Sequence, residues 1–154
     1  MNTALSDNRE FVHTASKRFG SQAIVASIDV VKTAAGERVT VHGGGVSIDC
    51  SPVDWAKRAV DLGVGEILLT SVDREGTARG YDLELTKRVQ EAVDIPVIAH
   101  GGAASRDDLA KPILDAGASA SAAGSLFVFR AAGQGVLINY PSRRQMRQLF
   151  SEIV

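Results

Sequence analysis

The chain has 154 residues, of which 23% are charged and 45% hydrophobic, and 17 basic and 18 acidic residues give it a net charge of −1. This is the composition of an ordinary globular domain with its own core, and its balanced charge excludes a global field that would recruit nucleic acid or a membrane. With one cysteine, Cys50, no apolar run near the roughly 20 residues of a membrane span and no secretion signal at the N-terminus, we expect a cytoplasmic protein without a disulfide framework.

Apolar segments typical of buried strands alternate with amphipathic segments along the chain. The predicted strands lie near 22–28, 66–71, 95–99 and 118–123, and the predicted helices near 7–19, 52–62, 81–93, 105–116 and 142–153. Such alternation requires parallel strands joined by crossover helices. The sequence therefore predicts one α/β domain over residues 1–154, built from four parallel βα units.

The connection between the first strand and the next long helix is unusually long. We expect the first strand to stop at Asp29, which leaves residues 32–51 with two short polar-apolar patches on either side of Gly43-Gly44-Gly45. A loop of this length in a compact domain is usually functional. The segment is predicted to be a small excursion or flap over the strand ends.

Each predicted strand ends in polar residues or glycine. The strand ends are Asp29, the segment 70–76 (Thr-Ser-Val-Asp-Arg-Glu-Gly), His100-Gly101-Gly102 and Gly124-Ser125. Because the carboxyl ends of parallel strands share one edge of the sheet, a site is predicted there, against the alternative of solvated polar turns. Asp73 and Glu75 are two residues apart, so in an extended chain their side chains would point to the same side.

The glycine turns after successive strands favour a phosphate site. Phosphate needs several convergent N–H donors, and glycine lets the backbone approach an anion closely. Barrels often place such a site after their last two strands and before a short extra helix, for which 126–131 is the candidate. Helix stops and ordinary turns also use glycine, but two such turns together with Ser125 predict a phosphorylated small-molecule ligand.

Several segments, in the correct order, resemble the cyclase subunit family of imidazole glycerol phosphate synthase. They are GEILLTSVDREGTARGYD (65–82), PVIAHGGA (96–103) and ASAAGSLFVF (120–129). SQAIVASID (21–29) resembles the fifth strand of that family, and residues 2–4 resemble the end of its fourth. The resemblance implies the C-terminal half of a (β/α)8 TIM barrel, a cyclase (lyase) of histidine biosynthesis, and no cofactor.

Two features qualify this resemblance. GVLINYPS (135–142) is similar to a paralogue found with surface amino-sugar genes, which helps to amidate an N-acetylated sugar. A barrel of this kind needs about 250 residues and eight strands, and the catalytic aspartate on the family's first strand has no counterpart here. The chain is therefore expected to be a fragment, a split-gene product or a half barrel completed by an N-terminal half or by self-association. A phosphate-binding half barrel without catalysis is the alternative, so activity of the chain alone stays open.

The resemblance implies roles for the acidic and hydroxyl residues. Asp29 matches the family's general acid/base, with a capping carboxylate as the alternative. Thr70, Asp73 and Glu75 match positions that line the pocket, although the family has aspartate where Glu75 stands. The alternatives are a satisfied strand hydroxyl for Thr70 and ion pairs with Arg74 or Arg79 for the two carboxylates.

The remaining implied roles concern phosphate and ammonia. Asn2 and Thr3 match one phosphate-contacting turn, and the other phosphate site is predicted at Gly76, Gly101, Gly102, Gly124 and Ser125. Glu66 matches a charged ring that gates ammonia from a glutaminase subunit. His100 stands where the family usually has a small residue, so it is either a structural histidine or a ligand contact. The histidines have no metal-ligand spacing, and no metal is predicted.

Overall fold

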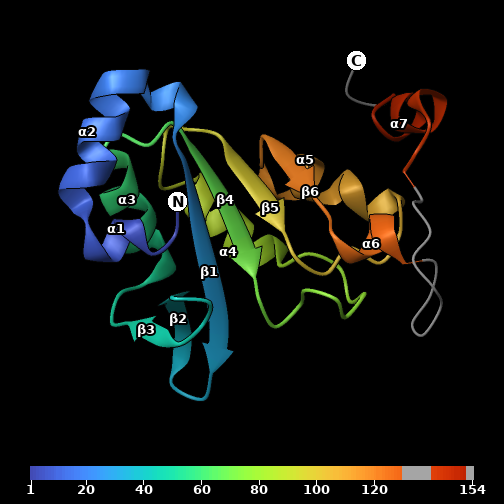
Figure 1. Ribbon diagram of the computed structural model, residues 1–154. Helices are drawn as coiled ribbons and strands as arrows, with labels where there is room; N and C mark the ends of the chain where they lie inside the picture. The colour runs from blue at the N-terminus through green and yellow to red at the C-terminus, as the bar shows by residue number, and fades with distance from the viewer. Residues whose placement is uncertain (130–139, 152–154) are drawn as a thin grey trace.

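A six-stranded sheet forms the centre of the computed structural model, which describes residues 1–129 and 140–151 (Figure 1). The strands are β1 (Val25–Thr33), β2 (Gly36–Val41), β3 (Val46–Ile48), β4 (Glu66–Ser71), β5 (Val97–His100) and β6 (Ala120–Ala122), in the order β3-β2-β1-β4-β5-β6. Neighbouring strands among β1, β4, β5 and β6 are parallel. The predicted α/β class and the four parallel strands of a half barrel are therefore confirmed.

Several of the helices follow a residue whose side chain caps their first turn. They are α1 (Ala4–Asp7), α2 (Arg9–Phe19), α3 (Pro52–Asp61), α4 (Leu83–Gln90), α5 (Lys111–Ala116), α6 (Ser125–Val128) and α7 (Arg143–Leu149), with 3₁₀ turns at Ser21–Ala23 and Asp107–Leu109. The side chains of Ser51 and Asp82 accept hydrogen bonds from the first turns of α3 and α4. No helix in the described ranges is long and apolar enough to cross a membrane. The sequence segment 135–142, with its amino-sugar resemblance, lies mostly outside those ranges.

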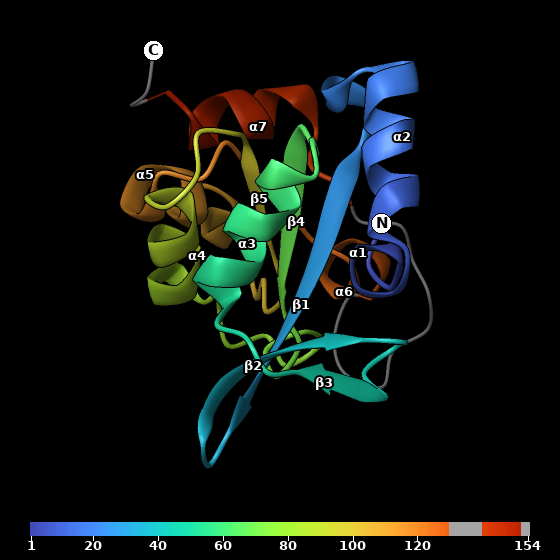
Figure 2. The ribbon, with the colours of Figure 1, turned by 90° about the vertical axis from the view of Figure 1, so that its left-hand side faces the viewer.

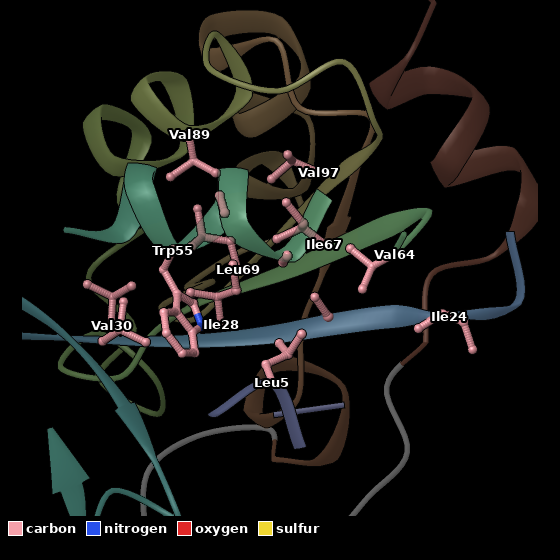
Figure 3. Packing of buried hydrophobic residues seen from close by; sticks show 14 of the residues in the cluster. Leu5, Ile24, Ile28, Val30, Trp55, Val64, Ile67, Leu69, Val89 and Val97 are labelled. Atoms are coloured by element: carbon pink, nitrogen blue, oxygen red, sulfur yellow. The ribbon is translucent and has the colours of Figure 1, made fainter. Parts of the chain in front are cut away.

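The two faces of the sheet differ in burial. Side chains alternate along β1, and Ala26, Ile28 and Val30 are buried against the helices, at most 2% exposed. Figure 2 shows α3 and α4 lying against this face, which we call the helix side, and Figure 3 shows Trp55 packed against β1 there. The alternate residues, including Ser27 and Asp29, are half-buried on the other face, which we call the open face.

The long connection after the first strand is a β-hairpin, so the expected strand end at Asp29 was wrong and the alternative of a flap does not hold. β1 passes through Asp29 to Thr33, and residues 29–33 pair antiparallel with residues 36–40 of β2. Val39 is fully buried in the core, so β2 extends the sheet and does not cover the strand ends as a flap. The physical reason is local: β-branched residues occupy both segments, and Gly36, with φ of +106°, closes the turn between them.

The first residues of the chain lie beside β1. The Met1 amino group donates to the carbonyl of Val25, and the Ser27 N–H donates to the Met1 carbonyl at 2.7 Å. These two bonds on alternate residues of β1 are the pattern of a parallel strand. They hold Asn2 and Thr3 near the carboxyl ends of the parallel strands, where β4 also ends.

Candidate active site

The register of the sheet aligns two of the predicted site residues, Asp29 and Thr70, with His100 in one row on the open face. Asp29 of β1 pairs with Thr70 of β4, and Thr70 pairs with His100 of β5. Because neighbouring strands are about 4.8 Å apart, the three side chains lie close enough to contact one small ligand. All three are half-buried and lie at or near the carboxyl ends of the parallel strands.

Asp29 is held by neutral hydrogen-bond donors. Asn2 Nδ2 lies 3.3 Å from Asp29 Oδ2, and Ser27 Oγ lies 3.3 Å from Asp29 Oδ1. Asn2 Nδ2 also lies 3.1 Å from the carbonyl oxygen of Ser27 and 3.3 Å from that of Thr40. These contacts orient a carboxylate that is still partly open to solvent, which is an arrangement suited to proton transfer with a bound ligand.

Ser27 was not among the predicted site residues. Its position two residues before Asp29 on one strand places both side chains on the open face. That spacing was the available signal, and it becomes informative once the strand is known to include Asp29.

A second group of polar side chains connects the ends of β4 and β5 to the start of α6. Ser125 Oγ donates to Glu75 Oε1 at 3.1 Å, and the other oxygen, Glu75 Oε2, lies 3.7 Å from His100 Nε2. His100 Nδ1 is 3.2 Å from Thr70 Oγ1. The structure therefore joins the row of Asp29 to Ser125 through Thr70, His100 and Glu75.

Two of the predicted glycines lie beside this group. A Cβ added at Gly76 would be 3.7 Å from Ser125 Oγ, and one added at Gly124 would be 3.3 Å from Glu75 Oε1. The turn after β6 and the turn after β4 thus face each other at Ser125. A Cβ at Gly76 would be in ordinary contact with the serine hydroxyl, whereas one at Gly124 would press against the Glu75 carboxylate.

Gly101 and Gly102 have a different reason to be glycine. Their φ angles are +100° and +99°, and a Cβ would lie 2.5 Å from the Ser71 carbonyl oxygen and 2.3 Å from the Gly80 carbonyl oxygen. The Gly80 N–H also donates to the Gly102 carbonyl at 2.7 Å. Packing against the β4–α4 connection is enough to require glycine at both positions, so their part in binding phosphate stays a prediction.

Asp73 and Glu75 do not point to the same side. The N–H groups of Arg74 and Glu75 both donate to the Ser71 carbonyl, so the chain turns and is not extended at this point. Asp73 Oδ2 accepts a hydrogen bond of 2.5 Å from the Lys32 N–H. The expectation from an extended chain was therefore wrong, because a turn separates residues that a strand would align.

Asp73 instead belongs to a charged hollow of 330 Å³ beside the site. The hollow is lined by Lys32, Ser71, Asp73, Arg74 and Arg79. Ser71 lies on the helix side of β4 together with the buried Leu69, so part of the lining of this hollow comes from the side of the sheet opposite to Asp29. The sequence did not predict it, because the hollow joins Lys32 to the distant segment 71–79.

Buried polar groups anchor the connection between β4 and α4. Burial opposes the charged form of Asp82, but Lys32 Nζ at 2.8 Å, the Leu85 N–H and the charge of Arg74 outweigh it and lower the pKa of this carboxyl. Burial raises the pKa of Tyr81 to about 12, and its hydroxyl donates to the Ala122 carbonyl at 2.9 Å. These two residues hold the segment that carries Glu75 and Gly76.

Two other predicted site residues lie apart from the row. Thr3 Oγ1 accepts a hydrogen bond of 3.1 Å from the His42 N–H and so ties the N-terminal segment to the turn after β2. Glu66 begins β4 and pairs with Val25, at the end of the strands opposite to Asp29 and Thr70. Its side chain is half-buried on the open face, as are those of Leu68 and Thr70.

Known proteins resemble this chain over most of its length. The family model described as "Histidine biosynthesis protein" matches residues 1–132. The imidazole glycerol phosphate synthase subunit HisF of Alkaliphilus metalliredigens is 48% identical over 128 residues, which are 82% of this chain and 51% of that protein. The subunit of the same name from Metallosphaera sedula is 47% identical over 127 residues, again 82% of this chain and 51% of the relative. The chain therefore spans about half the length of the curated relatives it matches.

Proposed function

Because this chain belongs to the histidine biosynthesis protein family, we propose that it supplies one half of the active site of an imidazole glycerol phosphate synthase cyclase subunit. In that reaction, ammonia combines with a bisphosphorylated ribonucleotide intermediate to give imidazole glycerol phosphate and an aminoimidazole carboxamide ribotide. The observation that carries the proposal is the row of Asp29, Thr70 and His100 on the open face, with Asn2 and Ser27 hydrogen-bonded to Asp29.

Each group in the row has a chemical task in this proposal. Asp29 exchanges protons with the reacting nitrogen and carbon atoms of the ligand, and the donors Asn2 and Ser27 keep its carboxylate aimed at them. Ser125 and the backbone of the surrounding glycine turns bind one phosphate of the ligand. The second phosphate is held at the turn of Asn2 and Thr3, so the ligand spans the row between the two.

The proposal includes two protein partners. An N-terminal half barrel, or a second copy of this chain, covers the open face and supplies the remaining strands, since half-buried polar and apolar residues line that face. A glutaminase subunit delivers ammonia at the opposite end of the strands, where Glu66 lies on the same face. The word "subunit" in the names of both relatives supports assembly with another protein.

The test combines this chain with the N-terminal half of a related cyclase subunit and measures ammonia-dependent formation of imidazole glycerol phosphate. Asp29→Asn should lower turnover by about 100-fold or more, because it removes an acid/base group and keeps the shape of the side chain. Asp49→Asn is the matched control, since Asp49 is exposed outside the row. Unchanged turnover with Asp29→Asn would refute the catalytic role. Phosphate binding without turnover in the unmodified pair would instead indicate a non-catalytic binding module.

A further inference from the structure

We propose that Glu75 occupies the anion site at Ser125 when no ligand is bound, and that His100 receives the Glu75 carboxylate when an anion enters. This inference rests on the proposed phosphate role of Ser125 and describes how that site is controlled. It makes Glu75 and His100 determinants of anion affinity, in addition to the groups that contact the anion.

The first step of the argument concerns the Ser125 hydroxyl. A serine hydroxyl has one proton to donate, and here that proton is directed at Glu75 Oε1 at 3.1 Å. The same carboxylate oxygen would lie 3.3 Å from a Cβ at Gly124, so it rests against the turn that precedes Ser125. An anion cannot take the hydroxyl proton until Glu75 gives it up.

The second step concerns charge. A carboxylate and a phosphate that share one donor at hydrogen-bond distance are like charges in close contact, which is costly at a partly buried site. The Glu75 side chain is 33% exposed, so it has room to rotate and is not locked by packing. Anion binding at Ser125 therefore requires the carboxylate to move, and the energy of that movement lowers the observed affinity.

The third step identifies where the carboxylate goes. Glu75 Oε2 already lies 3.7 Å from His100 Nε2, a separation that is too long for a good hydrogen bond but short enough for a small rotation to close. The other ring nitrogen, His100 Nδ1, is already hydrogen-bonded to the Thr70 hydroxyl, 3.2 Å away. When Thr70 donates to Nδ1, the neutral ring carries its proton on Nε2, directed at Glu75.

The lengths of the two side chains suit this exchange. The Glu75 carboxylate reaches Ser125 Oγ at 3.1 Å, and the His100 ring supplies a group to which the carboxylate can withdraw.

Calorimetric titration of the full chain with inorganic phosphate tests the proposal. Glu75→Gln keeps the shape and removes the charge, so phosphate should bind about tenfold more tightly than to the unmodified chain. Glu75→Ala should do the same. Glu91→Gln is the matched control and should leave the affinity unchanged, because Glu91 is exposed at the end of α4. Folding of each variant is checked by circular dichroism.

His100 provides the second arm. His100→Ala should weaken phosphate binding several-fold, because the carboxylate then has no partner to receive it. In the Glu75→Gln background, adding His100→Ala should not weaken phosphate binding further, because position 75 then carries no negative charge that His100 must accommodate. If His100 were purely structural, His100→Ala would instead weaken phosphate binding equally in the unmodified chain and in Glu75→Gln.

Ser125→Ala separates failure of this inference from failure of the proposed function. If Ser125→Ala weakens phosphate binding and Glu75→Gln does not tighten it, Glu75 only positions the serine and the inference is overturned. If Ser125→Ala binds phosphate like the unmodified chain, or if phosphate binds to no variant, the phosphate role of Ser125 fails and this inference fails with it.

Discussion

Gly102 and Gly43 both have positive φ angles, but only Gly102 is packed against neighbouring backbone. Their φ angles are +99° and +64°, and a Cβ at Gly102 would meet the Gly80 carbonyl oxygen at 2.3 Å, whereas nothing lies within 4 Å of one at Gly43. Positive φ alone is a modest cost for an L-residue. The close approach at Gly102 adds a steric cost that cannot be relieved without moving the β4–α4 connection.

We therefore expect Gly102→Ala to lower the free energy of unfolding by about 3 kcal/mol, the sum of backbone strain and overpacking. Gly43→Ala, the matched control, should cost about 1 kcal/mol from strain alone. Urea unfolding followed by circular dichroism measures both. Equal costs for the two variants would show that the Gly80 contact yields easily, and a phosphate-binding reason for Gly102 would then gain weight.

At the scale of elements, the β2–β3 hairpin is part of the core. Val39 of β2 is fully buried and belongs to the same cluster as Ile28 and Trp55, whereas Val46 of β3 is 46% exposed. The Arg88 guanidinium on α4 also contacts the Glu37 carboxylate of β2 at 2.6 Å. The hairpin is therefore held from the helix side as well as through its ladder with β1.

This difference within one hairpin leads to a direct comparison. Val39→Ala should lower the free energy of unfolding by about 2 kcal/mol, because it leaves a cavity in the core. Val46→Ala should change it by less than about 0.5 kcal/mol, as exposed substitutions usually do. Thermal or urea denaturation supplies the measurement. If Val39→Ala were as mild as Val46→Ala, β2 would contribute little to the core.

At the scale of the whole molecule, the open face is the main feature still to be covered. Leu68 and Ile98 are half-buried there beside the row of Asp29, and β6 lies at one edge of the described sheet. Apolar side chains and strand edges exposed in this way favour association with a complementary surface. Completion of the barrel, by an N-terminal half or by a second copy, is the arrangement that would cover both.

We expect the chain alone to self-associate in a concentration-dependent manner in sedimentation velocity, and to form a defined complex when the N-terminal half is added. Leu68→Glu should weaken both associations, because it places a charge on the open face. Leu114→Glu should not, since Leu114 is 50% exposed on α5. A monomer at every concentration, unaffected by the N-terminal half, would contradict this prediction.

Local patterns in the sequence determined the class of fold and the edge at which the site lies. Apolar runs alternating with amphipathic segments imply parallel strands and crossover helices, because each pattern matches the period of one element. Thr70 and His100 could be assigned to strand ends for the same reason. Ser51 and Pro52 marked the start of α3, because a cap and its helix are neighbours in the chain.

Only the tertiary structure decided which of these residues meet. Glu75 contacts Ser125 across 50 residues of sequence, and Gly102 is required to be glycine by Gly80 of another segment. Asp73 lies away from Glu75 because the chain turns after Ser71, and β1 continues past Asp29 because β2 pairs with it. Such contacts join backbone and side chains of different elements, and the spacing of residues within one element carries no information about them.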